Sequence, residues 1–191
     1  MLTTFYRKAI VMARPIDDTI PEVKPCLPIV ITPLRDQDLP AYIQLRPDQD
    51  RNVIKRRLAN GDQCFAVWHQ GRILHAGWVT TKQKYESYLR RELILQRGDI
   101  FLYDHFTHPS FRRCGLARAR EVHVLRHYRE EGYRQSIAII AIENKAAFLP
   151  FQAVGYHSIG MVKCLRFGPW QWDWEERWDE KLFPTLTRMK M

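Results

Sequence analysis

The sequence predicts a mixed α/β or α+β domain in which helices flank a central sheet. The stretch "QCFAVWHQGRILHAGWVTT" (residues 63–81) places two apolar runs on either side of Gln70-Gly71, which is typical of an antiparallel hairpin. Residues 99–142 then read as strand, helix and strand, which predicts a parallel crossover. A sheet that contains both kinds of pairing is a mixed sheet.

Composition restricts the function classes. The chain has 191 residues, of which 46% are hydrophobic and 27% charged, as expected for one globular domain. No apolar run approaches the ~20 residues of a membrane span. The four cysteines form no CxxC pair, so we expect reduced thiols, a cytoplasmic protein and no metal site. The net charge of +9 suits a phosphorylated cofactor or an acidic protein, and no nucleic-acid-binding motif accompanies it.

The first half of the chain is predicted to contain an N-terminal extension, a strand and two short helices. Residues 1–28 hold four prolines and are predicted to form the extension. "PIVITPL" (28–34) is β-branched and predicts a strand, and residues 35–45 and 48–60 predict two short helices. The second helix is expected to end at Asn60-Gly61. Residues 82–97 fit either a charged helix or extended strands.

In the second half, "DIFLYDHFTH" (99–108) predicts a strand, and residues 115–131 predict a helix with an apolar stripe. "SIAIIAI" (136–142) is a continuous apolar run, as in a strand buried on both faces. A short helix from Asn144 and a strand over 156–167 follow. Residues 168–191 contain four tryptophans and are predicted to pack on the domain as a last strand or helix, or to line a groove.

The loop between the strand at 99–108 and the next helix has the chemistry of an anion site. The first amides of a helix lack intrahelical acceptors and lie at the positive end of the macrodipole. Gly115 and Ala117 lack bulk, so a phosphate can approach the backbone, while Arg112 and Arg113 add positive charge. The alternative is a tight turn that uses the glycine for its backbone freedom.

Two motifs resemble those of the GNAT superfamily, the Gcn5-related N-acyltransferases. "THPSFRRCGLA" resembles the acyl-CoA signature V-x-P-x-x-R/Q-x-x-G-x-G/A, with matches at Thr107, Pro109, Arg112, Gly115 and Ala117. "NKAAFLPFQAVGY" resembles the second signature N-x-x-A/S-x-x-x-Y-x-x-x-G-F, and its matches are Asn144, Ala147, Gly155 and Tyr156. The resemblance covers residues 29–167, which therefore form the predicted GNAT domain between the extension 1–28 and the tail 168–191.

The resemblance implies an acyltransferase that moves an acyl group from acyl-CoA to a primary amine of a small molecule, amino acid or peptide. It implies no metal, and a monomer or homodimer remains open. The residues it assigns to the CoA site are Phe106, Thr107, Arg112, Arg113, Cys114, Gly115, Leu116, Ala117, Arg118, Asn144 and Phe151.

The catalytic residues are less clear because the sequence departs from the family pattern. The position of the usual acid tyrosine is Phe151, which has no proton to give. His105 is the candidate base, and period-two alternation predicts that it shares a strand face with Tyr103. Asp104 is a candidate to orient His105 or a tyrosine, and the hydroxyl of Tyr103 is a further candidate. A purely structural role for His105 is the alternative.

Three further possibilities stay open at this point. Acetyl is the usual acyl group, but the segment 82–97 and the tryptophan tail keep a long fatty acyl donor in consideration. The basic surface also suits an acidic acyl carrier protein as donor. A non-catalytic CoA-binding module would use the same loop without chemistry.

His123 and His127 are spaced so that they lie on one helix face, and we expect them at the surface rather than at a metal.

Overall fold

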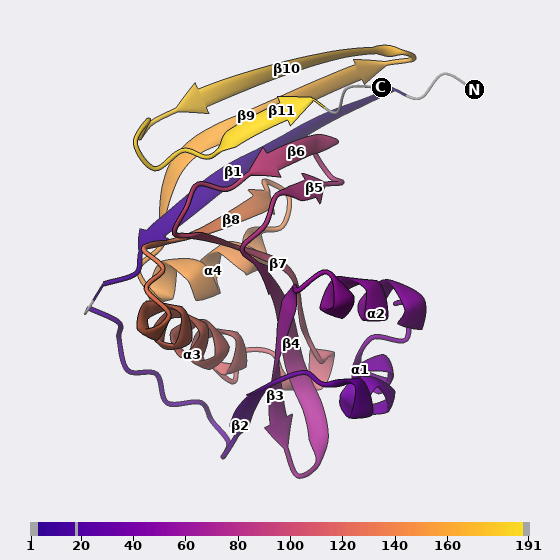
Figure 1. Ribbon diagram of the computed structural model, residues 1–191, viewed down its shortest axis with the longest axis vertical. Helices are drawn as coiled ribbons and strands as arrows, with labels where there is room; N and C mark the ends of the chain where they lie inside the picture. The colour runs from indigo at the N-terminus through magenta and orange to yellow at the C-terminus, as the bar shows by residue number, and fades with distance from the viewer. Residues whose placement is uncertain (1–3, 18, 189–191) are drawn as a thin grey trace.

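The computed structural model describes residues 4–17 and 19–188, which form two sheets and four α-helices (Figure 1). The larger sheet has the strand order β10-β9-β1-β8-β7-β4-β3-β2. In chain order its strands are β1 (Thr4–Pro15), β2 (Val30–Pro33), β3 (Gln63–His69), β4 (Arg72–Thr80), β7 (Asp99–Thr107), β8 (Gln135–Ala141), β9 (His157–Phe167) and β10 (Trp170–Arg177). The smaller sheet, ordered β11-β6-β5, contains β5 (Lys84–Glu86), β6 (Arg91–Ile94) and β11 (Thr185–Arg188).

Helices cover both faces of the large sheet (Figure 1). On one face, α3 (Leu116–Glu130) and α4 (Lys145–Ala153) pack on a core that includes Phe65 and Ile100. On the other, α1 (Leu39–Leu45) and α2 (Arg51–Ala59) cover β3 and β4. The predicted pair of short helices is confirmed, and α2 ends at Asn60, before Gly61 with its positive φ of 86°. Within the described residues, no helix combines the length and apolar character of a membrane span.

The N-terminal segment is the main departure from the sequence prediction. Residues 4–15, predicted as part of an extended arm, form β1 in the interior of the large sheet. Ala9 pairs with Ala141 of β8 on one side and with Val162 of β9 on the other. The apolar run "AIVMA" is buried, whereas the residues before it are exposed or half-buried. That run is only five residues long and stands among charged residues and prolines, which explains why it did not read as a central strand.

The segment 82–97 and the C-terminal tail both form strands. Residues 84–94 form the β5–β6 hairpin, and β11 pairs with β6, so the ambiguity is resolved against a helix. Leu89 and Leu93 are fully buried in the core between the two sheets.

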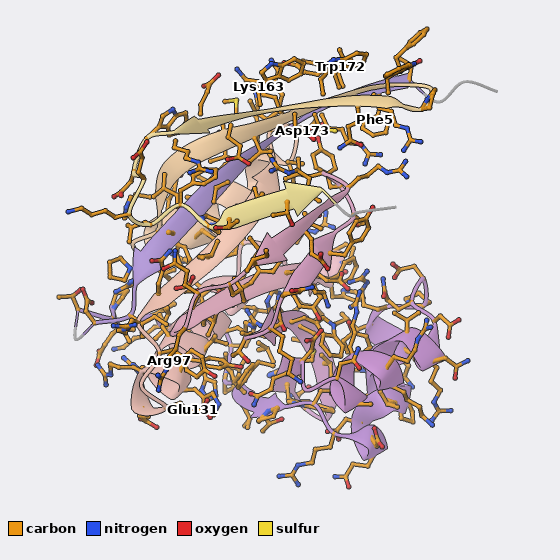
Figure 2. All side chains as sticks on the ribbon, turned by 45° about the horizontal axis from the view of Figure 1, so that its top comes forward. Phe5, Arg97, Glu131, Lys163, Trp172 and Asp173 are labelled. Carbon is orange, nitrogen blue, oxygen red and sulfur yellow. The ribbon has the colours of Figure 1, made fainter. Side chains whose placement is uncertain are left out.

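In the tail, β10 presents Trp170, Trp172 and Trp174 to the outside, with Trp170 65% exposed. Figure 2 shows Trp172 and Lys163 on the outer side of this layer, while Asp173 points the other way. These tryptophans therefore line no groove of the core.

The predicted parallel crossover is confirmed and creates the opening in the sheet. β7 and β8 pair in parallel only from Asp99–Leu102 to Gln135–Ala138. Beyond Leu102, β7 continues to pair with β4, while β8 continues to pair with β1. Because each strand follows a different neighbour, the two separate, and the loop that enters α3 lies at the mouth of the gap.

Candidate active site

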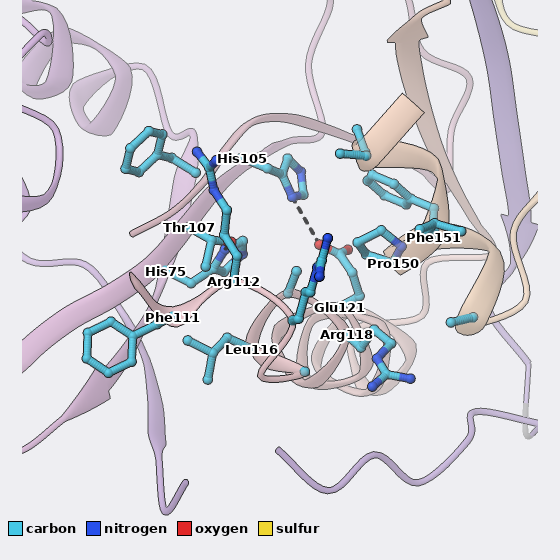
Figure 3. Close-up of a pocket in the computed structure, with 18 of the residues that line it drawn as sticks. His75, His105, Thr107, Phe111, Arg112, Leu116, Arg118, Glu121, Pro150 and Phe151 are labelled. Carbon is cyan, nitrogen blue, oxygen red and sulfur yellow. Dashed lines mark hydrogen bonds and ion pairs between the residues drawn. The ribbon is translucent and has the colours of Figure 1, made fainter. Parts of the chain in front are cut away.

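A cavity of about 870 Å³ lies where β7 and β8 separate (Figure 3). This volume is in the range of small-molecule and cofactor sites. Its walls come from β4 and β7, from the loop 108–115, and from the facing sides of α3 and α4. All the residues that the resemblance assigned to the CoA site line it except Cys114: Phe106, Thr107, Arg112, Arg113, Gly115, Leu116, Ala117, Arg118, Asn144 and Phe151.

The loop has the geometry expected of an anion site. A short 3₁₀ helix over Pro109–Phe111 leads to Gly115, which is the N-cap of α3 with a φ of +74°. That left-handed conformation favours glycine and lets the chain turn directly into the helix. The first amide groups of α3 have no acceptor within the helix, and Arg112, Arg113 and Arg118 stand around them at the cavity wall.

Cys114 lies on the reverse side of this loop. Its side chain packs in a small apolar cluster with Leu27, Ile29 and Leu116 rather than in the cavity. The side chain of Cys114 therefore adds no support for its assignment to the CoA site, which stays a prediction.

A β-bulge decides which side chain of β7 reaches the cavity. The register between β4 and β7 shifts between Ala76 and Trp78, so Gly77 lies opposite both Asp104 and His105. Asp104 takes a positive φ of 50°, which breaks the alternation of side chains. His105 consequently points to the α3 side, while Tyr103 points to the opposite face. The prediction that Tyr103 and His105 share a face is wrong for this reason.

His105 forms a pair with a buried carboxylate on α3. Its Nδ1 lies 3.1 Å from Oε1 of Glu121, whose side chain is 1% exposed (Figure 3). Arg120, which is fully buried, donates to the same oxygen at 2.8 Å and to the carbonyl of Gly77 at 2.5 Å. Burial alone would raise the pKa of Glu121, but the charges of Arg120 and His105 outweigh it and lower the pKa to about 2. Glu121 is therefore a permanent carboxylate.

The ionised Glu121 sets the tautomer of His105. A carboxylate only accepts hydrogen bonds, so Nδ1 of His105 carries a proton, and in the neutral form of the ring the lone pair is on Nε2. Nε2 is buried and has no hydrogen-bond partner within the described part of the chain. His105 lines the cavity, so Nε2 is the atom of this pair that is left to bond a group held there, although it is covered in this structure.

A second histidine, His75, stands beside the first. Its Nδ1 lies 2.8 Å from Oγ1 of Thr107, and its ring centre is 6.2 Å from that of His105. Burial, together with the charge of His105, lowers the pKa of His75 well below its usual value, so this imidazole is neutral. It therefore adds a polar but uncharged surface to the cavity.

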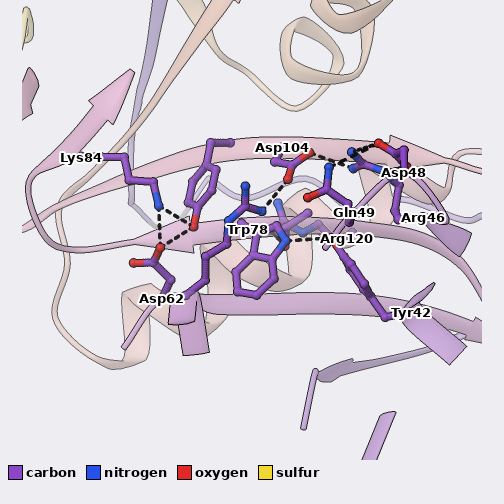
Figure 4. Close-up of polar contacts among 12 residues, drawn as sticks. Tyr42, Arg46, Asp48, Gln49, Asp62, Trp78, Lys84, Asp104 and Arg120 are labelled. Carbon is purple, nitrogen blue, oxygen red and sulfur yellow. Dashed lines mark hydrogen bonds and ion pairs between the residues drawn. The ribbon is translucent and has the colours of Figure 1, made fainter. Parts of the chain in front are cut away.

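Asp104 and Tyr103, the other predicted catalytic residues, are not among the residues that line the cavity. Asp104 is held between Nη1 of Arg46 at 2.8 Å and Nη1 of Arg57 at 2.5 Å (Figure 4). Burial would raise the pKa of Asp104, but its bonds to the two arginines outweigh this and lower it.

The hydroxyl of Tyr103 donates to Asp62 and accepts from Lys84 at 2.9 Å. Burial and the Asp62 bond raise the Tyr103 pKa. Neither Tyr103 nor Asp104 is placed to act on a molecule in the cavity.

Phe151 closes the cavity next to the candidate base. Its ring centre lies 5.3 Å from that of His105 and 4.9 Å from that of Tyr156. The hydroxyl of Tyr156 is buried and donates to Oγ of Ser136 at 2.5 Å, so Tyr156 has a packing role. No hydroxyl therefore stands at the position of Phe151.

Sequence reasoning missed Arg120, Glu121, His75 and Gly77. One signal was present: Glu121 lies four residues before Leu125 and seven before Tyr128, on the apolar stripe of α3, where a charge requires a buried partner. His123 and His127 were expected at the surface, but both are half-buried and their rings contact Phe65 at 5.7 and 5.3 Å.

Known proteins share this architecture. A family model described as the acetyltransferase (GNAT) family matches residues 31–156. An acetyltransferase from Colwellia psychrerythraea is 16% identical with a TM-score of 0.62, over 87% of this chain and 57% of that chain. The ribosomal-protein alanine N-acetyltransferase of Escherichia coli is 16% identical with a TM-score of 0.52, over 66% and 76%. An aminoglycoside N-acetyltransferase in complex with CoA is 20% identical with a TM-score of 0.51, over 68% and 92%.

At 16–20% identity, the similarity to these solved structures shows a shared fold. The chain spans 67%, 57% and 52% of the length of three of the solved structures it resembles. A comparison with functionally curated proteins finds no match.

Proposed function

Because the chain belongs to the acetyltransferase (GNAT) family, we propose that it transfers an acyl group from acyl-CoA to a primary amine in the cavity between β7 and β8. One observation carries the chemical part of this proposal. The His105–Glu121 pair leaves Nε2 without a partner among the described residues, and His105 lines the same cavity as the loop that suits a diphosphate. Acyl-CoA supplies the activated thioester, and no metal is needed.

The loop is the proposed site for the CoA pyrophosphate. The free amides at the start of α3 and the side chains of Arg112, Arg113 and Arg118 offer donors and positive charge on one wall. The gap between β7 and β8 offers the unpaired strand edges along which a pantetheine arm can run toward His105. Phe151 and Asn144 line the opposite wall, on the α4 side.

His105 is the proposed base. Nε2 of His105 accepts a proton from the attacking amine as the new carbon–nitrogen bond forms, and Glu121 stabilises the imidazolium that results. The carbon–sulfur bond of the thioester then breaks. Since Phe151 has no proton to donate, we propose that the same imidazolium returns its proton to the departing thiolate. His105 thus ends the cycle neutral, and a single residue serves as base and then as acid.

The proposed acyl group is acetyl, and the acceptor is an amine of a small molecule, amino acid or peptide. The exposed tryptophans of β10 no longer support a long fatty acyl donor, because they lie away from the cavity. The exposed Arg112, Arg113 and Arg118 also suit the acidic surface of an acyl carrier protein, so the donor has to be tested directly.

Ligand-induced thermal stabilisation tests the donor. The melting temperature of the native protein is measured with CoA, acetyl-CoA and palmitoyl-CoA. A ligand at 100 times its Kd contributes about 2.7 kcal/mol, or about 5–10 °C for a chain of this size. The Arg112→Glu variant is expected to lose this shift. Arg51→Glu, which makes the same charge change on the exposed start of α2, is expected to keep it.

Thiol release in the presence of amines tests the chemistry. His105→Ala is expected to lower kcat by roughly 10²- to 10⁴-fold and to keep the CoA-induced shift in melting temperature. Stabilisation by CoA without thiol release from any acyl donor would instead support a non-catalytic CoA-binding module. Failure of all CoA species to bind would overturn the proposed donor, and an acylated carrier protein would be tested next.

A further inference from the structure

The segment between β1 and β2 passes the reverse side of the cavity loop. We call residues 19–29 the strap, and Figure 1 shows this stretch running past α3 on its way to β2. The backbone N–H of Cys26 donates to the carbonyl of Cys114 at 3.0 Å. Cα of Pro25 lies 3.4 Å from the position that a Cβ on Gly115 would occupy. The strap and the loop are therefore in direct contact.

This contact brings two thiols together. Cys26 is exposed, Cys114 is half-buried, and both are free cysteines. The backbone bond between them keeps the two Cα atoms close together, as a disulfide requires, since a disulfide spans Cα atoms roughly 4.4–6.8 Å apart. The other two cysteines, Cys64 and Cys164, are buried in β3 and β9. Cys26 and Cys114, the two cysteines that are not buried, are thus also the two that lie next to each other.

We propose that Cys26 and Cys114 form a reversible modification site, at which a low-molecular-weight disulfide such as oxidised glutathione converts the two thiols into an intramolecular disulfide. One thiolate attacks the oxidant, which forms a mixed disulfide and releases one glutathione thiolate. The second cysteine thiolate attacks the protein sulfur of that mixed disulfide and displaces the second glutathione. Two cysteine protons pass to the two glutathione thiolates, so the oxidant is reduced as the cysteines are oxidised.

The disulfide would tether the strap to the loop from outside the cavity. Arg113 and Gly115 line the cavity, whereas Cys114 between them faces Leu27 and Ile29 of the strap. The sulfur–sulfur bond would therefore occupy no part of the cavity. Formation of the disulfide does not depend on the proposed acyl transfer. Only an effect of the disulfide on CoA binding would depend on it. The hydrogen bond to Cys114 raises the pKa of Cys26, so the reaction is expected to be faster at alkaline pH.

Peptide mapping of the native full-length chain tests the site. The protein is incubated with oxidised glutathione, remaining thiols are alkylated, and the digest is analysed by mass spectrometry without reduction. We expect a cross-link between the Cys26 and Cys114 peptides, a fall in free thiols from four to two, and a rise in melting temperature that dithiothreitol reverses.

Variants define which result would overturn the proposal. Cys26→Ser and Cys114→Ser are each expected to abolish the cross-link, and Cys64→Ala is expected to keep it. Stable glutathione adducts without a cross-link, disulfide-linked dimers, or a cross-link that forms only in denaturant would each refute it. None of these outcomes depends on CoA binding, so a failure here is separable from a failure of the proposed acyl transfer.

Discussion

Replacing Glu121 with glutamine removes the carboxylate that Arg120 and His105 share while keeping almost the same shape. The free-energy cost follows from the pKa of Glu121, which moves from 4.5 to about 2 in the folded protein. A lowering of this size corresponds to about 3 kcal/mol. Breaking a buried ion pair by removing one partner costs about 3–5 kcal/mol, which agrees. We expect the free energy of unfolding at pH 7 to fall by about 3 kcal/mol.

The stability that Glu121 contributes is expected to decrease as the pH falls. Because the folded pKa lies below the unfolded one, the carboxylate contributes its full stability above pH 4.5 and loses it as the pH falls toward 2. The difference between wild type and Glu121→Gln should shrink by about 2 kcal/mol between pH 7 and pH 3. Chemical denaturation across this pH range measures both values.

The same variant tests the link to catalysis. A glutamine can donate to Nδ1, which favours the wrong tautomer of His105, so kcat is expected to fall roughly 10²- to 10⁴-fold. Glu131→Gln, at the exposed C-cap of the same helix, is the matched control and should change neither quantity appreciably. Equal pH dependence of stability in wild type and Glu121→Gln, or full activity of the variant, would refute the reasoning.

Three further substitutions probe the surroundings of the cavity. Gly77→Ala places a methyl group 3.1 Å from Nδ1 of His105, so it should destabilise the fold by about 1–3 kcal/mol in denaturation and lower kcat; unchanged kcat would contradict this. Ser136→Ala leaves the buried Tyr156 hydroxyl unpaired and should cost about 1–3 kcal/mol, a loss that an added Tyr156→Phe should largely recover. Phe151→Tyr introduces a proton donor beside the base, and steady-state kinetics should show a higher kcat; an unchanged or lower kcat would mean that protonation of the thiolate does not limit turnover.

The parts of the fold that depend on local pattern could be predicted. The β3–β4 hairpin, the crossover through α3 and the loop at Gly115 each show in a short stretch of sequence, because turn residues and apolar periodicity act over a few positions. β1 could not be predicted in the same way. What makes it a central strand is pairing with β8 and β9, more than a hundred residues later.

The site could be predicted in part for similar reasons. The loop, the cavity wall and the presence of His105 in it followed from the motifs and the strand. The bulge did not, because it arises where Gly77 of one strand meets Asp104 and His105 of another. Glu121 was overlooked because a charged helix residue is normally solvent-exposed, and only its place on the apolar stripe distinguished it.

The interior position of β1 also bears on how the chain assembles during synthesis. Residues 4–15 leave the ribosome long before their partners, Gln135–Ala141 and His157–Phe167. At about 5–20 residues per second, roughly 8–30 s separate the emergence of β1 from that of β9. Throughout that interval the "AIVMA" segment is an unpaired apolar strand, the kind of segment that aggregates or recruits chaperones. Refolding of this chain should accordingly be slow for its size, because the pairing of β1 with β8 and β9 joins residues more than a hundred positions apart.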